Sequence, residues 1–266
     1  MRNYTMRYYL LLWFIFPGIS VIGQSAVIKK VEQRNPITQE LYVFPNIFIK
    51  DFSNKARKIN NRLRSEILEV DPNTQDSKIF DRVWRTKKQS PTLTELTYEI
   101  IRNDKSILSL KISAEGCGAY CESWDRYFTF NLKTGNQLLL DSLINNKGLI
   151  KLSADFNFFR QTKINDKIKE IKDTLETNAV QNNKDDLNYY TEMLNLYKDC
   201  IESKITLEDL TDIKFSVNSV DLRLYSDRCS AHYNRNLDEL WDFEYIIELT
   251  DWTENLTKYG RSFIHK

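Results

Sequence analysis

The chain has 266 residues, with 38 Lys and Arg against 37 Asp and Glu, and a formal net charge of +1 at pH 7. This balance argues against the basic excess typical of nucleic-acid-binding proteins, so we expect no nucleic-acid partner. A hydrophobic fraction of 41% and a charged fraction of 28% indicate a globular chain. With only 7 glycines, the sequence also disfavours the glycine-rich loops of nucleotide-binding folds.

Residues 1–23 have the organisation of a secretion signal. Two arginines precede an apolar run, and Val21 and Gly23 then stand at the −3 and −1 positions before Gln24. The alternative is a membrane anchor, but the apolar run has only about half of the roughly 20 residues that a spanning helix needs. We therefore predict a signal peptide over residues 1–23, a periplasmic or secreted location, and no stable membrane span after cleavage.

Residues 24–266 are then expected to form a single domain, in which residues 24–36 are a short leader. The next segment, residues 41–49, is apolar and rich in β-forming residues. Pro45 within it predicts an edge strand or a bend, because proline cannot donate a hydrogen bond to a sheet.

Residues 51–70 predict a helix. Asp51 is its expected N-cap, and Pro72 prevents its continuation. Apolar residues recur at spacings of three and four, which places them on one helical face: Ala56, Ile59, Leu63 and Ile67. Residues 71–92 are polar and predict a long connection.

The pattern then changes to that of strands. Residues 96–101 and 107–112 predict two strands, because the polar segment between them has the composition of a hairpin turn. Residues 127–132 predict a third strand, and an apolar segment at residues 138–143 continues beyond the following turn.

The second half begins with a segment, residues 146–209, that contains no proline and predicts two or three helices, including residues 148–175 and 185–201. Further strands are predicted at residues 213–217, 220–225 and 243–249, and a short terminal helix at residues 251–256. Groups of strands with helices between them indicate an α+β fold in which an antiparallel sheet has helices packed on one side.

The four cysteines all follow the signal segment, and an even number in an exported chain predicts two disulfides. Three pairings are possible, and local spacing favours Cys117–Cys121 and Cys200–Cys229. The second would close a loop of about 30 residues and stabilise the chain by about 3.5 kcal/mol in the chain-entropy model. The alternative is a metal site, since Cys229 and His232 are spaced C-x-x-H, but an oxidising compartment competes for the thiols. We expect no metal.

The sequence contains no recognisable catalytic motif. Its two histidines are His232 and His265, and the first lies in a segment beside a cysteine where a structural role is the simpler interpretation. Carboxylates are plentiful, for example Glu115, Glu122, Asp125, Asp238, Glu239 and Asp242. A glycoside-hydrolase pair requires a set separation across a cleft, which sequence alone does not supply. We interpret these acids as a solvated surface.

The segment from Tyr120 to Asp125 is the strongest candidate for a binding site. A disulfide would stiffen it, and Tyr120 and Trp124 would then offer contact area at a low entropic cost. The alternative is that Trp124 begins the next strand and points into the core, which is the commoner position for tryptophan.

Three segments together resemble a known family: residues 106–113, then Gly118-Ala119-Tyr120, then residues 127–135 with the apolar segment at 138–143. They are similar to the extracytoplasmic domain shared by RsiV-type anti-sigma factors and PdaC-type deacetylases. The resemblance implies an α+β envelope domain that lies outside the deacetylase catalytic domain, and some members bind lysozyme. The cysteine pair around the loop departs from that pattern, and the chain has neither a deacetylase domain nor an anti-sigma segment. Lysozyme binding and catalytic residues are therefore not carried over.

These observations predict an exported cell-envelope module that binds a protein or a glycan, with no catalysis and no cofactor of its own. The alternative is a hydrolase or transferase that acts on cell-wall polysaccharide with a carboxylate pair. A third possibility is a purely structural envelope protein. Opposed carboxylates in a deep cleft would favour the enzyme, whereas a flat aromatic face would favour binding.

Overall fold

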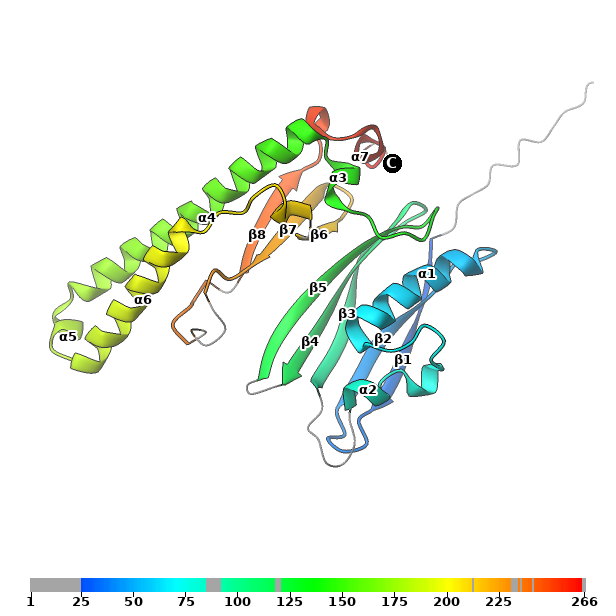
Figure 1. The fold of residues 1–266 in the computed structure, drawn as a ribbon, viewed down its shortest axis with the longest axis horizontal. Coiled ribbons are helices and arrows are strands. Elements are labelled where there is room, and N and C mark those ends of the chain that lie inside the picture. Colours follow the sequence, from blue (N-terminus) through cyan, green and yellow to red (C-terminus); the bar gives the residue numbers. More distant parts are fainter. Residues whose placement is uncertain are drawn as a thin grey trace, which may run out of the picture.

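The computed structural model describes residues 25–84, 92–117, 121–211, 213–230, 234, 236–240 and 242–264. Its architecture is α+β, as the sequence predicts, but the strands form two sheets (Figure 1). The first sheet contains β1 (Val27–Arg34), β2 (Leu41–Phe48), β3 (Leu93–Asn103), β4 (Ile107–Cys117) and β5 (Cys121–Asn131). The second contains β6 (Lys214–Val217), β7 (Asp221–Asp227) and β8 (Asp242–Glu248).

The helices fall into two groups that accompany the two sheets. The first group comprises α1 (Ser53–Leu63), a π-helical turn (Arg64–Leu68), a 3-10 turn (Asp76–Lys78) and α2 (Asp81–Trp84). The second comprises α3 (Leu140–Leu143), α4 (Asn146–Leu175), α5 (Asn178–Gln181), α6 (Lys184–Glu202), two 3-10 turns (Asp209–Thr211 and Thr253–Asn255) and α7 (Lys258–Arg261). No helix among the described residues is both long enough and apolar enough to cross a membrane.

The first sheet has the order β1-β2-β3-β4-β5 and is antiparallel except between β2 and β3. Residues 24–36, expected to be a leader, instead contain β1, which pairs with β2 along its whole length. That expectation was wrong because β1 is mostly polar and half-exposed, so the alternation of apolar and polar residues that predicts a strand is weak. Strand β2 pairs with β3 at Tyr42 and Leu96, whereas Pro45 is paired with Lys30 of β1. Of the two alternatives that Pro45 predicts, the edge strand is wrong, because β2 lies between β1 and β3.

Helix α1 lies against one face of the first sheet (Figure 1). All four apolar residues of the predicted helical face are buried. The expected cap is wrong, however, because Asp51 has a left-handed backbone (φ 61°) and Phe52 precedes the helix without a side-chain cap. The α-helix ends at Leu63, and the π-helical turn then carries Ile67 to the core.

On strands β4 and β5, the side chains of one sheet face are buried in the core. Leu110 of β4 is opposite Phe128 of β5, and both are buried beneath the first helical group. The alternate residues of β5, among them Asp125 and Tyr127, point to the other face, since successive strand residues point in opposite directions. The opposite face of β5, which is more polar, is therefore available to form a binding site.

The second half corrects one further expectation. The apolar segment at residues 138–143 does not extend the strands, because its last four residues form helix α3. Helices α4 and α6 pack against each other and against one face of the second sheet, where Phe156, Tyr197 and Phe243 are buried. The first sheet and the second sheet therefore each carry their helices on one face, and the predicted fold class is confirmed.

The two sheets meet along β6, which contacts β5 and β4. The Ser109 hydroxyl accepts a hydrogen bond from the Val217 amide at 3.3 Å, on the face of the first sheet opposite α1. Helix α1 and the pair α4 and α6 consequently lie on the outer sides of the molecule (Figure 1). The sheet faces that carry Tyr127 and Tyr225 point toward each other, since these two rings are stacked.

Candidate functional site

A cleft of about 580 Å³ lies between β5 and the second sheet. The described residues that line it are Glu122, Ser123, Trp124, Asp125, Arg126, Tyr127, Lys214, Tyr225, Asp227, Arg228, Ser230 and Asp242. One wall is thus a continuous stretch of β5, and the opposite wall comes from β6, β7, β8 and the segment after β7. The volume lies within the range of small-molecule sites, about 300–1,000 Å³.

Two stacked tyrosines join the walls of the cleft. The rings of Tyr127 and Tyr225 are 3.7 Å apart at their centroids and within 5° of parallel. Burial raises the pKa of Tyr127 far above the ordinary tyrosine range, and the neighbouring Tyr225 and Asp125 add to the shift. Burial likewise raises the pKa of Tyr225, whose hydroxyl lies 3.1 Å from the Ser216 hydroxyl. Both rings therefore stay neutral and form a fixed aromatic pair in the lining of the cleft.

Trp124 lies on the same strand and is half-buried. Its ring packs against the core of the first sheet, and the Arg126 guanidinium lies 5.2 Å from the ring centroid. Gly116 on β4, two positions after the residue opposite Trp124, makes room for the indole, since a Cβ there would lie 3.1 Å from its nitrogen. Trp124 is thus both a packing residue and a cleft residue. Tyr120, the other predicted binding residue, lies outside the described residues.

Three aspartates line the cleft. Asp227 and Asp242 are directly opposite each other in the β7–β8 pair, and the Lys214 ammonium lies 2.6 Å from Asp227 Oδ1. Loss of surrounding water raises the pKa of Asp242, Asp227 adds to the shift, and Lys214 acts in the opposite direction. On the facing strand, Asp125 accepts a hydrogen bond from the Ser113 hydroxyl at 2.5 Å. The cleft therefore places carboxylates on both walls.

An ion pair between Glu122 and Arg228 connects the two walls. Each partner is adjacent in sequence to a disulfide, because Glu122 follows Cys121 and Arg228 precedes Cys229. Only 9% of the Arg228 side chain is exposed, so the pair is shielded from solvent on the arginine side. The two walls are therefore joined by an ion pair whose partners each lie next to a disulfide.

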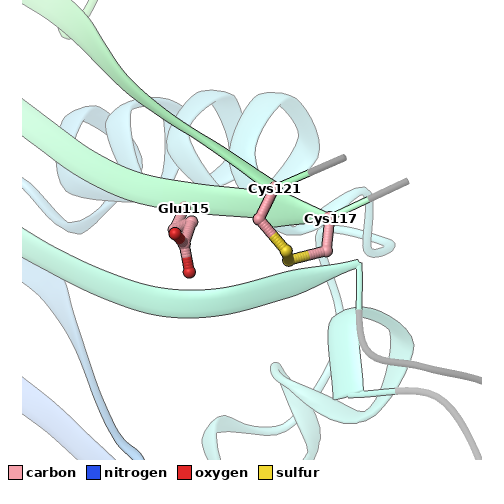
Figure 2. Close-up of side chains that lie close together, drawn as sticks. All are labelled: Glu115, Cys117 and Cys121. Carbon is pink, nitrogen blue, oxygen red and sulfur yellow. A yellow bond between two sulfur atoms is a disulfide. The ribbon is translucent and has the colours of Figure 1, made fainter. Parts of the chain in front are cut away.

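Both predicted disulfides are present, with Cα–Cα distances of 4.0 Å for Cys117–Cys121 and 5.5 Å for Cys200–Cys229. Among the described residues, one group has metal-ligand atoms within 4.8 Å of one another, namely Glu115 with the first disulfide (Figure 2). Disulfide sulfurs are not the thiolates that bind zinc, so this donor set does not fit a metal while the bond is intact. Cys229 is likewise bonded to Cys200, and His232 and His265 lie outside the described residues.

Sequence reasoning named several cleft residues and missed the others. Trp124 was a predicted binding residue, and three of the acids that were interpreted as a solvated surface line the cleft: Glu122, Asp125 and Asp242. Asp238 is buried instead, and its carboxylate accepts a hydrogen bond from the Tyr197 hydroxyl at 2.9 Å. Tyr225 and Asp227 were missed, because the strand predicted over residues 220–225 ends before Asp227, whereas β7 extends to Asp227 and its i, i+2 spacing places both residues on one face.

Comparison with known proteins identifies a shared fold. A crystal structure of a member of the DUF3298 family from Bacteroides fragilis is 10% identical, with a TM-score of 0.55 over 92% of this chain and 98% of that one. A DUF3298 family protein from Pseudomonas aeruginosa PAO1 is 9% identical, with a TM-score of 0.50 over 89% of this chain and 96% of that one. No family model matches the chain, and neither does any curated protein. At these identities, the similarity concerns the fold alone.

Proposed function

We propose that the chain is an exported cell-envelope module whose single domain, residues 24–266, binds a glycan or a protein segment in the cleft between the sheets. The signal-like segment at residues 1–23 supports export, and the two disulfides are of the kind that persists in an oxidising compartment. The sequence resemblance to the RsiV- and PdaC-type extracytoplasmic domain supports the same location. The DUF3298 fold neighbours are compatible with it.

The observation that carries the proposal is the combination of aromatic and charged side chains in one concave site. Tyr127 and Tyr225 offer a rigid apolar surface, while Asp125, Asp227 and Lys214 offer hydrogen-bonding groups around it. A pocket with an apolar surface and a few convergent polar groups is the usual form of a ligand site. A sugar has an apolar ring face and many hydroxyls, so a glycan matches this lining better than an apolar peptide does.

Co-sedimentation with purified peptidoglycan tests the proposal. We expect the chain from Gln24 onward to pellet with peptidoglycan, and Tyr225→Ala to weaken binding by about 2 kcal/mol, or about 30-fold. Phe158→Ala is the matched control, because Phe158 on α4 is 74% exposed and lies outside the cleft lining. Tyr225→Phe keeps the aromatic ring and should retain most of the affinity. No binding, or equal losses in Tyr225→Ala and Phe158→Ala, would count against a glycan site in the cleft.

A second candidate function is cell-wall hydrolysis by a carboxylate pair. The specific observation in its favour is the raised pKa of Asp242 beside Asp227, because a general acid needs a carboxyl that holds its proton near working pH. The two functions differ in one readout. Release of reducing ends from peptidoglycan, abolished by Asp242→Asn, would establish the hydrolase. Binding without release of reducing ends supports the non-catalytic module.

A further inference from the structure

A second surface lies at the opposite edge of the first sheet, between β1, β2 and α1. It is a groove of about 540 Å³, and the described residues that line it are Val27, Lys29, Ile47, Phe48, Ile49, Lys50, Ser53, Ala56, Arg57, Asn60, Asn61, Arg64 and Pro72. Because the sheet order is β1-β2-β3-β4-β5 and the groove is lined by β1 and β2, strands β3 and β4 separate it from the strand that forms the cleft wall. The two surfaces are therefore spatially separate.

The groove has an apolar floor that continues onto exposed side chains. Ile47 and Ile49 are buried at its base, whereas Val27 and Phe48 are 57% and 42% exposed. Phe52, at the start of α1, is 46% exposed beside it. Contiguous apolar side chains in water are unfavourable and mark an interaction surface.

The charged residues among the described residues that line this groove all have one sign. Among the described lining residues, Lys29, Lys50, Arg57 and Arg64 are basic and none is acidic. Helix α1 itself contains four basic residues and no acidic residue. The Arg64 guanidinium forms an ion pair with the Asp76 carboxylate at 2.5 Å. Lys29, Lys50 and Arg57 form no ion pair with any described residue. The rim therefore presents unneutralised positive charge to whatever covers the floor.

A lysine side chain lies over each of the two exposed phenylalanine rings. The Lys29 ammonium lies 4.8 Å from the centroid of the Phe48 ring, and the Lys55 ammonium lies 3.6 Å from that of Phe52. Exposed phenylalanines with flexible lysines beside them match a bilayer interface, where rings enter the acyl boundary and ammonium groups meet lipid phosphates. Isolated lysines suit the diffuse negative charge of a membrane, since they do not depend on fixed partners.

We propose that this groove and the adjacent Phe52 form a peripheral docking surface for an anionic phospholipid membrane. The apolar side chains of Val27, Phe48 and Phe52 enter the interface, and Lys29, Lys50, Lys55 and Arg57 neutralise lipid phosphates. Attachment through this edge leaves the cleft at β5 directed away from the point of contact. The proposal is independent of the ligand that the cleft binds.

Vesicle sedimentation tests the docking surface with the chain from Gln24 onward, which contains the whole described fold. We expect stronger partition to vesicles of equal phosphatidylglycerol and phosphatidylcholine than to pure phosphatidylcholine, and weaker partition at high salt. Lys50→Glu with Arg57→Glu should lower partition at least about tenfold, since each basic residue near an anionic surface contributes substantially. Phe48→Ser with Phe52→Ser should also lower it.

The matched control is Lys169→Glu with Lys172→Glu, which reverses two exposed charges on α4 far along the sequence from the groove. This control should change partition less than twofold, and thermal melting verifies that every variant is folded. Equal partition to neutral and anionic vesicles, no partition to either, or an equal loss in the α4 control would each overturn the proposal. Binding of the chain to a soluble acidic protein but not to vesicles would also overturn it.

Discussion

The two edges of the five-stranded sheet carry opposite chemistry on one scaffold. At the β5 edge, the cleft contains both signs of charge, stacked tyrosines and two flanking disulfides. At the β1 edge, the groove has an apolar floor, basic groups and no acidic lining residue among those described. One sheet thus separates a polar cleft flanked by disulfides from an open groove that is apolar and basic.

The largest expected effect comes from breaking the core that both edges share. Phe130 is fully buried in the cluster that joins β5 to α1. Phe130→Ala should lower the free energy of unfolding by about 3–5 kcal/mol, because it removes buried surface and leaves a cavity. Urea denaturation measures this loss. Phe158→Ala on the exposed side of α4 should stay within about 0.5 kcal/mol of the parent chain.

Both disulfides lie beside the cleft, and we expect them to contribute unequally to the stability of the fold. Cys200 and Cys229 are 29 positions apart, and replacing both by serine should cost about 3.5 kcal/mol of stability in the chain-entropy model. The shorter Cys117–Cys121 loop should contribute only about 2 kcal/mol. Thermal melting of the two double variants gives the order, and a larger loss for the Cys117–Cys121 pair would contradict it.

Trp124 contributes to both the core of the first sheet and the cleft, because its side chain is half-buried between them. Trp124→Ala should reduce stability by about 1–3 kcal/mol, less than loss of a fully buried ring, and should also weaken ligand binding in the cleft. Melting combined with peptidoglycan sedimentation separates the two effects. A full loss of about 3–5 kcal/mol without any change in binding would make Trp124 a packing residue only.

The smallest expected effect concerns Asp242. Its raised pKa means that the folded chain holds this proton more tightly than the unfolded chain, so ionisation of Asp242 destabilises the fold above that pKa. Asp242→Asn should therefore raise the melting temperature at pH 7, with a gain in the free energy of unfolding below about 1 kcal/mol because the residue remains open to solvent. The gain should disappear below the ordinary carboxyl range, where both chains are neutral at this position. A gain that grows toward low pH would contradict the assigned direction.

The sequence was sufficient for most elements and for the disulfides. The helix predicted over residues 148–175 matches α4 almost to its ends, because no proline interrupts the segment. Strand β1 was missed, because it is mostly polar and gains its pairing from β2. Local periodicity carries no information about such a partner.

The cleft was the harder prediction for a related reason. Tyr127 and Tyr225 are stacked although almost 100 positions separate them, and the contact depends on how β6 places the second sheet beside β5. Likewise, Asp227 and Asp242 become neighbours only through the register of β7 and β8. Residue types could be predicted as candidates, whereas their convergence required the tertiary structure.

If the cleft is the ligand-binding surface, a bound glycan should protect its strands from solvent. Backbone hydrogen exchange of the chain with and without soluble peptidoglycan fragments measures this protection. We predict slower exchange in peptides from β5, β7 and β8 in the presence of the fragments, with unchanged exchange in α1 and β1. Protection confined to α1 and β1, or no protection in β5, β7 and β8 at saturating fragments, would contradict the account.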